Sequence, residues 1–222
     1  HFDVSVELNQ LLYDQGKDDV LADINGWMPK PGQVSYTRQM APLGLGHAVW
    51  CARHLIGDEP FAVLLADDLV MSETPCLKQM VDVYAETGGS VVAVMDVPLE
   101  HTNRYGILDV DHDDGRLASI KGLVEKPDPS DAPSTLSIIG RYILQPDVFR
   151  WLDRQEKGAG GEIQLTDAMA ASLDDGPFHG IRFEGRRFDC GDKAGFVEAT
   201  LAFALSRPEM APAIREIIEN LR

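Results

Sequence analysis

Residues 60–69 are Pro60-Phe61-Ala62-Val63-Leu64-Leu65-Ala66-Asp67-Asp68-Leu69, an apolar run that ends in two adjacent carboxylates. The run from Phe61 to Leu65 predicts a strand that is covered on both faces within a parallel sheet. Open α/β sheets bind their ligands beyond the carboxyl ends of the strands, where Asp67 and Asp68 are expected. Two interpretations stay open: the acidic pair holds a hard cation such as Mg²⁺ against substrate phosphates, or it caps the following turn.

The composition is that of a globular protein with no nucleic-acid partner. Of the 222 residues, 44% are hydrophobic and 25% are charged, so the chain is long enough to bury a core. A formal net charge of −16 opposes binding to a phosphate backbone, although a metal and a few cations could offset the charge of one nucleotide. No apolar run is long enough to span a bilayer, and three widely spaced cysteines do not suggest a disulfide framework. We therefore expect a cytoplasmic protein with no membrane partner.

Strand and helix signals alternate along the chain up to residue 97, beginning with a short strand expected over Val34–Gln39. Two apolar segments then flank Asp113-Asp114-Gly115, which predicts a β-hairpin. The alternation resumes after the hairpin, and residues 194–222 are expected to be helical. This order predicts one three-layer α/β/α domain over residues 1–222, with a mostly parallel central sheet and an inserted β-hairpin.

Apolar residues recur at helical spacing near the C-terminus, at Ile214, Ile217, Ile218 and Leu221. Such a stripe more often packs against the core and less often forms a contact between subunits. We expect the protein to be a homo-oligomer.

Polar residues and glycines gather where strands are expected to end. Gln39 precedes Gly44 and Gly46, whose backbone amides could approach a ligand closely, although a plain tight turn explains these glycines as well. The third glycine of a dinucleotide fingerprint is missing, so a nicotinamide site is not supported. Further along the chain come Gly106, the pair Glu125-Lys126, and Asp189.

Several motifs follow one another along the chain: Gln39 with Leu43-Gly44-Leu45-Gly46-His47-Ala48, Leu64-Leu65-Ala66-Asp67, Tyr105-Gly106, Val124-Glu125-Lys126-Pro127, Gly161-Glu162-Ile163-Gln164-Leu165-Thr166-Asp167 and Asp189-Cys190-Gly191-Asp192-Lys193. In this order they resemble the bacterial UTP–glucose-1-phosphate uridylyltransferases, members of the sugar-nucleotidyltransferase superfamily. The resemblance covers essentially the whole chain, and the last two motifs are specific to this family. It implies a Rossmann-like nucleotidyltransferase domain.

The resemblance implies transfer of the uridylyl group of UTP to glucose 1-phosphate, which yields UDP-glucose and diphosphate. Asp67 matches the Mg²⁺ ligand of the family and Asp189 matches a second metal-side carboxylate, so Mg²⁺ is the expected cofactor. Gln39, with the backbone at Gly44 and Gly46, matches the loop that binds uracil. A side-chain amide suits this role because it offers a donor and an acceptor to a pyrimidine edge.

On the sugar side, Gly106 and Glu125 match residues that contact glucose, and Lys126 matches the cation that holds the glucose phosphate. The resemblance therefore makes Asp67 and Lys126 the expected catalytic residues. By their position in the sequence alone, Glu125 and Lys126 also fit an exposed ion pair worth ~0–1 kcal/mol.

One part of the family pattern has no counterpart in the sequence. The family begins with a strand and a Gly-rich loop that carries an Arg and a Lys and wraps the nucleotide triphosphate. We expect either that such residues precede the given sequence or that the chain is a fragment without them. Two other functions stay open: a sister enzyme that uses dTTP or another sugar 1-phosphate, and a non-catalytic nucleotide-sugar-binding protein if the loop is absent.

Overall fold

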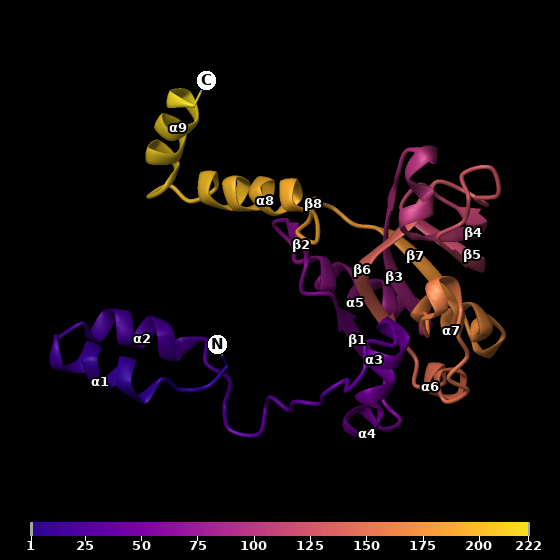
Figure 1. The fold of residues 1–222 in the computed structure, drawn as a ribbon, viewed down its shortest axis with the longest axis horizontal. Helices are drawn as coiled ribbons and strands as arrows, with labels where there is room; N and C mark the ends of the chain where they lie inside the picture. Colours follow the sequence, from indigo (N-terminus) through magenta and orange to yellow (C-terminus); the bar gives the residue numbers. More distant parts are fainter. Residues whose placement is uncertain (1, 222) are drawn as a thin grey trace. The chain divides into compact units, whose positions relative to one another are not determined.

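The computed structural model describes residues 2–221, which divide into two compact units, one that ends at Arg38 and one that begins at Gln39. The first unit contains α1 (Val6–Asp14) and α2 (Asp18–Gly26), which pack on each other (Figure 1). The sequence pattern does not predict this boundary.

The strand expected over Val34–Gln39 is wrong, because these residues adopt no regular structure. Val34 and Tyr36, which would share one face of such a strand, are both exposed. Alternating apolar residues form a stable strand only where a neighbouring strand takes up the backbone hydrogen bonds, and the described residues provide no such partner here.

The second unit is built on a mixed six-stranded sheet with the order β1-β6-β3-β7-β5-β4. Strands β3 and β7 pair in parallel, and the remaining pairings described in this sheet are antiparallel. The α/β class, the mixed sheet and the inserted hairpin β4–β5 are confirmed, with a larger antiparallel share than the sequence predicts. The strands are β1 (Phe61–Leu64), β3 (Ser90–Asp96), β4 (Gly106–Asp113), β5 (Leu117–Glu125), β6 (Leu136–Leu144) and β7 (Phe178–Arg182).

Helices cover both faces of this sheet and so make the predicted three layers (Figure 1). The helix α5 packs Met80 and Val83 against Val91 on one face, while the neighbouring Val92 points into the core on the other face. That second core is covered by α3, α6 and α7. The helices are α3 (Leu45–Cys51), α4 (Arg53–Ile56), α5 (Cys76–Thr87), α6 (Val148–Leu152) and α7 (Leu165–Ala171), with single 3₁₀ segments at Leu99–Arg104, Ala159–Gly161 and Leu173–Asp175.

The strand β1 corrects the prediction made from Phe61–Leu65. It lies at an edge of the sheet, pairs antiparallel with β6, and exposes Ala62 and Leu64, so it is neither parallel nor covered on both faces. An apolar run shows that a strand could be buried, but it does not specify which strand will lie beside it. The doubly covered strands are instead β3 and β6, whose residues are almost all buried.

A smaller two-stranded sheet joins β2 (Asp68–Met71) to β8 (Arg186–Asp189), with Asp68 opposite Asp189. The chain continues into α8 (Lys193–Leu205), whose first turn is capped because the Asp192 carboxylate accepts hydrogen bonds from two backbone N–H groups. It is followed by α9 (Ala211–Asn220). The β2–β8 ribbon therefore brings an acidic residue from the first third of the chain next to one from the last third.

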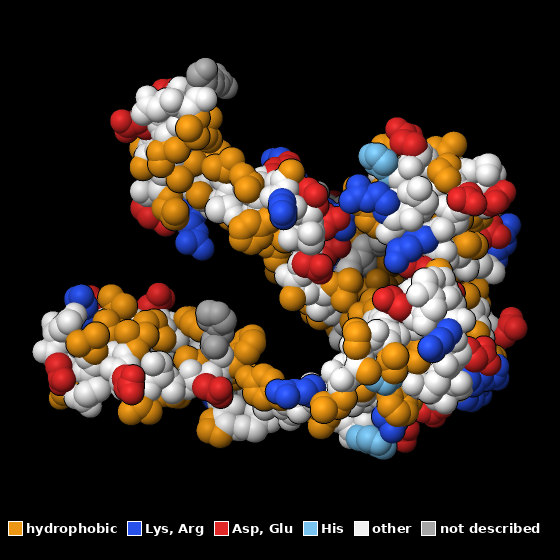
Figure 2. All heavy atoms as spheres, in the orientation of Figure 1, with side chains coloured by type: hydrophobic (Ala, Val, Ile, Leu, Met, Phe, Trp, Pro, Cys, Tyr) orange, Lys and Arg blue, Asp and Glu red, His pale blue; other side chains and the backbone are white. Residues whose placement is uncertain are grey.

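Apolar side chains are exposed on the terminal helices of both units (Figure 2). They include Phe196 on α8, Ile217 on α9 and Leu221 directly after α9, so the predicted C-terminal stripe is not part of the core. The homo-oligomer stays a prediction. Among the described helices, none is long and apolar enough to cross a membrane.

We expect His179 to make the stability of the fold fall at acidic pH. It lies on β7 between Val91 of β3 and Ser119 of β5, and its buried Nδ1 has no hydrogen-bond partner among the described residues. Burial lowers the pKa of His179, so the unfolded chain takes up a proton near pH 6.5 before the folded chain does. The contribution of His179 to stability is therefore complete above that pH and is lost as the pH falls through it.

Chemical unfolding at pH 8 and pH 5.5 checks this expectation. His179→Phe removes the titrating group and should lose less stability than the wild type between the two pH values. An equal loss in both proteins would show that the acid sensitivity comes from other groups.

Candidate active site

A cavity of about 260 Å³ opens where β4, β5 and β6 meet the start of α7. Its volume is close to the lower end of the ~300–1,000 Å³ range of ligand pockets. The predicted residues Gly106, Glu125 and Lys126 all line it. Polar residues distant in sequence also line the wall, among them Asp68, Thr166 and Arg187.

The inner wall is formed by Gly106 and Glu125, which lie opposite each other in the β4–β5 hairpin. The Glu125 side chain is only 11% exposed. A Cβ atom at position 106 would lie 3.2 Å from Oε2 of Glu125 and 3.0 Å from Oγ1 of Thr166. Glycine therefore keeps open the space in front of a carboxylate and a hydroxyl, both of which can bond to a polyol.

One cation of the cavity wall is Lys126, which follows the last residue of β5. Its backbone has φ +48°, an uncommon conformation for a non-glycine residue, and its N–H donates to the carbonyl of Tyr105 (3.0 Å). This turn places Nζ 3.4 Å from Oε1 of Glu125, with the lysine side chain 47% exposed. The ammonium group of Lys126 is half exposed, so it can also contact an anionic ligand that enters the cavity.

A further carboxylate lies behind Glu125. Partial burial and the charge of Glu125 raise the pKa of Asp167 above its ordinary value. A Cβ atom at Gly158 would overlap the Asp167 carboxylate, so the glycine loop before α7 folds closely over it. The Asp167 carboxylate therefore lies against the glycine loop and within range of the charge of Glu125.

The two adjacent carboxylates, Asp67 and Asp68, have opposite environments. Asp68 is 5% exposed, accepts a hydrogen bond from the N–H of Gly140 (2.9 Å), and accepts two more from Nε (3.0 Å) and Nη2 (2.9 Å) of Arg187. Asp67 is exposed. A buried carboxylate with three donors is a structural group, whereas an exposed one can bind a ligand.

The carboxylates of Asp67 and Asp189 converge on the space above Gly191. A Cβ atom at Gly191 would lie 3.1 Å from Oδ2 of Asp67 and 3.2 Å from Oδ1 of Asp189. The N–H of Cys190 holds the two strands together by donating to the carbonyl of Asp67 (2.7 Å). Two hard oxygen ligands that face one space fit Mg²⁺, which keeps several water or phosphate ligands. Within residues 2–221, no cluster of three or more His, Cys, Asp and Glu side chains could hold a metal by itself.

The glycines that follow Gln39 contact the motif of residues 161–167. Nε2 of Gln39 donates to the carbonyl of Gly44 (2.9 Å) and lies 2.9 Å from Nδ1 of His47. Gly46 donates to the carbonyl of Ile163 (2.9 Å), and a Cβ atom on Gly44 or Gly46 would lie 2.8 Å from that oxygen. Close backbone packing therefore accounts for both glycines. Gln39 and the two glycines do not line the 260 Å³ cavity, but the neighbouring Leu45 does.

Sequence reasoning missed Arg187, the residue that contacts most of the site. Besides its bonds to Asp68, its Nη2 lies 3.6 Å from Oδ2 of Asp189, and its guanidinium lies 5.4 Å from the centre of the Tyr105 ring. Alternation along β8 was the available signal, because residues two apart share a face and Arg187 precedes Asp189 by two. Burial by itself would lower the pKa of Arg187, but the bonds to Asp68 outweigh it and raise the pKa.

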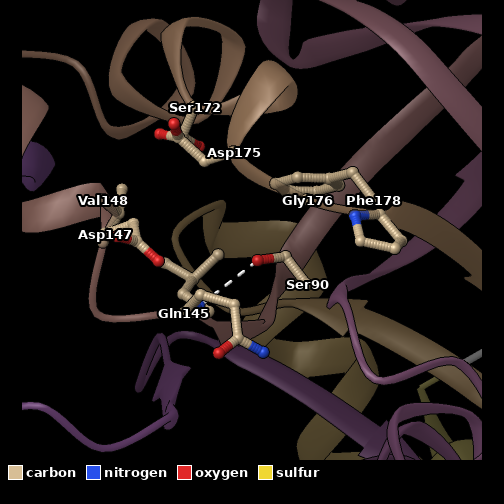
Figure 3. A pocket seen from close by; sticks show the side chains of 10 residues that line it. Ser90, Gln145, Asp147, Val148, Ser172, Asp175, Gly176 and Phe178 are labelled. Atoms are coloured by element: carbon tan, nitrogen blue, oxygen red, sulfur yellow. Dashed lines mark hydrogen bonds between the residues drawn. The ribbon is translucent and has the colours of Figure 1, made fainter.

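A second hollow lies at the opposite ends of the strands, between Ser90, Gln145 and Asp175 (Figure 3). Its volume is about 20 Å³, which is room for about one water molecule. The hydroxyl of Ser90 already accepts a hydrogen bond from the backbone N–H of Gln145 (3.3 Å). This hollow is too small to be a substrate site.

Comparison with known proteins adds to this geometry. The family model described as nucleotidyl transferase matches residues 9–205. A UTP–glucose-1-phosphate uridylyltransferase from Komagataeibacter xylinus is 53% identical over 193 residues, which are 87% of this chain and 68% of that protein. The structure of a UTP-bound UGPase from Acinetobacter baumannii has a TM-score of 0.89 and 36% identity, and the match covers 100% of this chain and 77% of that one. A UDP-glucose pyrophosphorylase solved with UDP-glucose has a TM-score of 0.79 and 38% identity, over 93% of this chain and 75% of the other.

The opposite environments of the acidic pair predict opposite effects of the same substitution. Asp68→Asn should lower the free energy of unfolding by about 3 kcal/mol, because it leaves the charge of Arg187 buried without a full partner. Asp67→Asn should change it by less than about 0.5 kcal/mol, because the side chain is exposed. Urea unfolding followed by circular dichroism measures both, and a larger loss for Asp67→Asn would contradict the assignment of Asp68 as the structural carboxylate.

Proposed function

We propose that this chain, which belongs to the nucleotidyl transferase family, transfers the uridylyl group of UTP to glucose 1-phosphate, giving UDP-glucose and diphosphate. One observation carries the proposal: the carboxylates of Asp67 and Asp189 converge beside a cavity that presents Glu125 and Lys126. The printed name of the 53% identical relative and the ligands named for the two similar structures support the same reaction.

The reaction requires positioning and charge neutralisation more than covalent chemistry. A phosphate oxygen of glucose 1-phosphate attacks the α-phosphorus of UTP, a new oxygen–phosphorus bond forms, and the bond to diphosphate breaks on the opposite side. No group of the protein becomes bonded to the substrate. The residues of the site act by fixing the attacking oxygen and by opposing the charge of the phosphates.

The sugar phosphate is assigned to the wall of the cavity. Glu125 accepts hydrogen bonds from glucose hydroxyls, and Gly106 leaves the space that the sugar ring needs. Lys126 binds the phosphate through its exposed ammonium group and restrains the attacking oxygen. Recognition of uracil is assigned to Gln39 and the backbone at Gly44 and Gly46, on the strength of the motif match.

Asp67 and Asp189 are the residues that would hold Mg²⁺. When bound there, the ion would supply electrostatic stabilisation to the phosphates of both substrates. The exposed carboxylate of Asp67 accepts this role without loss to the fold, because its neighbour Asp68 makes the structural contacts of the turn.

Diphosphate release in a coupled assay tests the reaction. The full-length protein should release diphosphate with UTP and glucose 1-phosphate, and more slowly with dTTP in place of UTP. Faster release with dTTP would favour the sister enzyme, because Gln39 alone does not distinguish uracil from thymine. Binding of UDP-glucose without turnover of either nucleotide would favour a non-catalytic binding protein.

We expect Gly191→Ala and Asp67→Asn to impair the same step. Alanine at 191 would put a methyl group 3.1 Å and 3.2 Å from the two carboxylate oxygens, and asparagine at 67 removes one charge. Each variant should reduce turnover by about 100-fold or more and raise the Mg²⁺ concentration needed for half-maximal rate. Gly176→Ala, at a glycine with open space around it, is the matched control. Wild-type Mg²⁺ dependence in both site variants would remove these residues from the metal site.

Glu125→Gln should weaken the binding of glucose 1-phosphate and leave the binding of UTP almost unchanged. Its proposed partners are glucose hydroxyls, so affinity for glucose 1-phosphate should fall by about 10-fold or more while UTP affinity changes little. Calorimetric titration with each substrate separately measures the two effects. A loss confined to UTP would contradict the assignment of the cavity to the sugar.

A further inference from the structure

We propose that Arg187 is a positioning residue that, through Asp68, sets the distance between the metal-side carboxylates and the sugar cavity. The inference rests on the proposed function, because it concerns the relative placement of the two halves of that site. Arg187 reaches both halves: it lines the cavity with Glu125 and Lys126, and it lies 3.6 Å from Asp189.

The pair of Arg187 and Asp68 is held rigidly. Both side chains are largely buried, at 12% and 6% exposed. Nε of Arg187 lies 3.0 and 3.1 Å from the two carboxylate oxygens of Asp68, and Nη2 lies 2.9 Å from Oδ2. The N–H of Gly140 completes the set of donors to Asp68. This forked geometry fixes direction as well as distance, which a single contact would not do.

Each end of the pair is connected to one half of the site. Asp68 follows Asp67 directly in the chain, and it lies opposite Asp189 in the β2–β8 ribbon. At the other end, the Arg187 guanidinium lies against the ring of Tyr105, whose carbonyl accepts the N–H of Lys126. A shift of Arg187 therefore moves the carboxylates and the cation relative to each other.

Arg187 is not assigned a bond to substrate. Two of its nitrogens are engaged by Asp68, and a move toward a ligand would leave that carboxylate buried without its partner. Burial of a charge pair is also a poor source of stability, since apolar replacements of similar volume are often equally stable. The fold alone does not explain a salt bridge at this point, whereas the need for fixed geometry does.

Four variants of the full chain test the inference: Arg187→Met, Asp68→Asn, the double variant Asp68→Leu/Arg187→Met, and Arg187→Lys. Arg186→Met is the matched control, because the adjacent Arg186 is 61% exposed and pairs with Glu198 on the surface. Unfolding measurements report stability, calorimetry with MgCl₂ in the presence of UDP-glucose reports metal affinity, and steady-state rates report kcat and KM.

We expect each single substitution at 68 or 187 to weaken Mg²⁺ binding and lower kcat by about 10- to 100-fold, as loss of a residue that orients metal ligands commonly does. The double variant leaves the N–H of Gly140 without its partner, so it should lose some stability, but less than either single variant. Its defects in Mg²⁺ affinity and kcat should remain and should be no larger than those of the milder single variant. Arg187→Lys keeps the charge without the fork and should show the same defects if the methionine variant does not fold. Arg186→Met should match the wild type.

Two results would overturn the inference. Wild-type Mg²⁺ affinity and kcat in the double variant would make the pair purely structural. A rise in KM for glucose 1-phosphate in Arg187→Met, with Mg²⁺ affinity and kcat unchanged, would make Arg187 a substrate contact. Absence of turnover in the wild type would count against the proposed function instead, and the calorimetric comparison would still decide the role of Arg187.

Discussion

The acidic turn of residues 65–68 depends on the buried strand β6. The N–H of Gly140 donates a hydrogen bond to the Asp68 carboxylate. The neighbouring Arg141 donates to the backbone carbonyls of Leu65 and Asp68. Gly140 also has to be glycine, because a Cβ atom there would lie 2.8 Å from the Cβ atoms of both Leu65 and Asp68. The exposed Asp67 is therefore presented by a turn that is hydrogen-bonded to the core strand and packed closely on it.

The same strand explains why the two halves of the site are close together. β6 pairs with β1 and β3 along its length and touches β4 at Ile107, next to Gly106. The turn that carries Asp67 and the hairpin that carries Glu125 are thus both anchored to one element that is buried on both faces. Rigid placement of this kind is what phosphoryl-type transfer requires, since its catalysis depends on geometry and charge rather than on a protein nucleophile.

Much of this arrangement could be predicted from the sequence. The features that could not be predicted were missed for the same reason, which is that they depend on contacts between distant segments. The hairpin at Asp113-Asp114-Gly115 and the cavity residues Gly106 and Glu125 followed from local signals and motifs. The edge position of β1 was missed because an apolar run carries no information about its neighbour. The Asp68–Arg187 pair was missed because its members are 119 positions apart, and one sequence contains no signal for a contact at that separation.

The backbone of Ile163 has a consequence for how the specificity of such a site can change. Its N–H donates to the carbonyl of Leu43, and its carbonyl accepts from the N–H of Gly46, so the loop after Gln39 and the segment before α7 are joined as by a short β-bridge. Thr166, three residues beyond Ile163, lines the sugar cavity. Under the proposed assignment of uracil to the Gln39 loop and of glucose to the cavity, base preference and sugar preference would be linked through these two hydrogen bonds. A change in the Gln39 loop that accepted another base would then also disturb the wall of the cavity that carries Thr166.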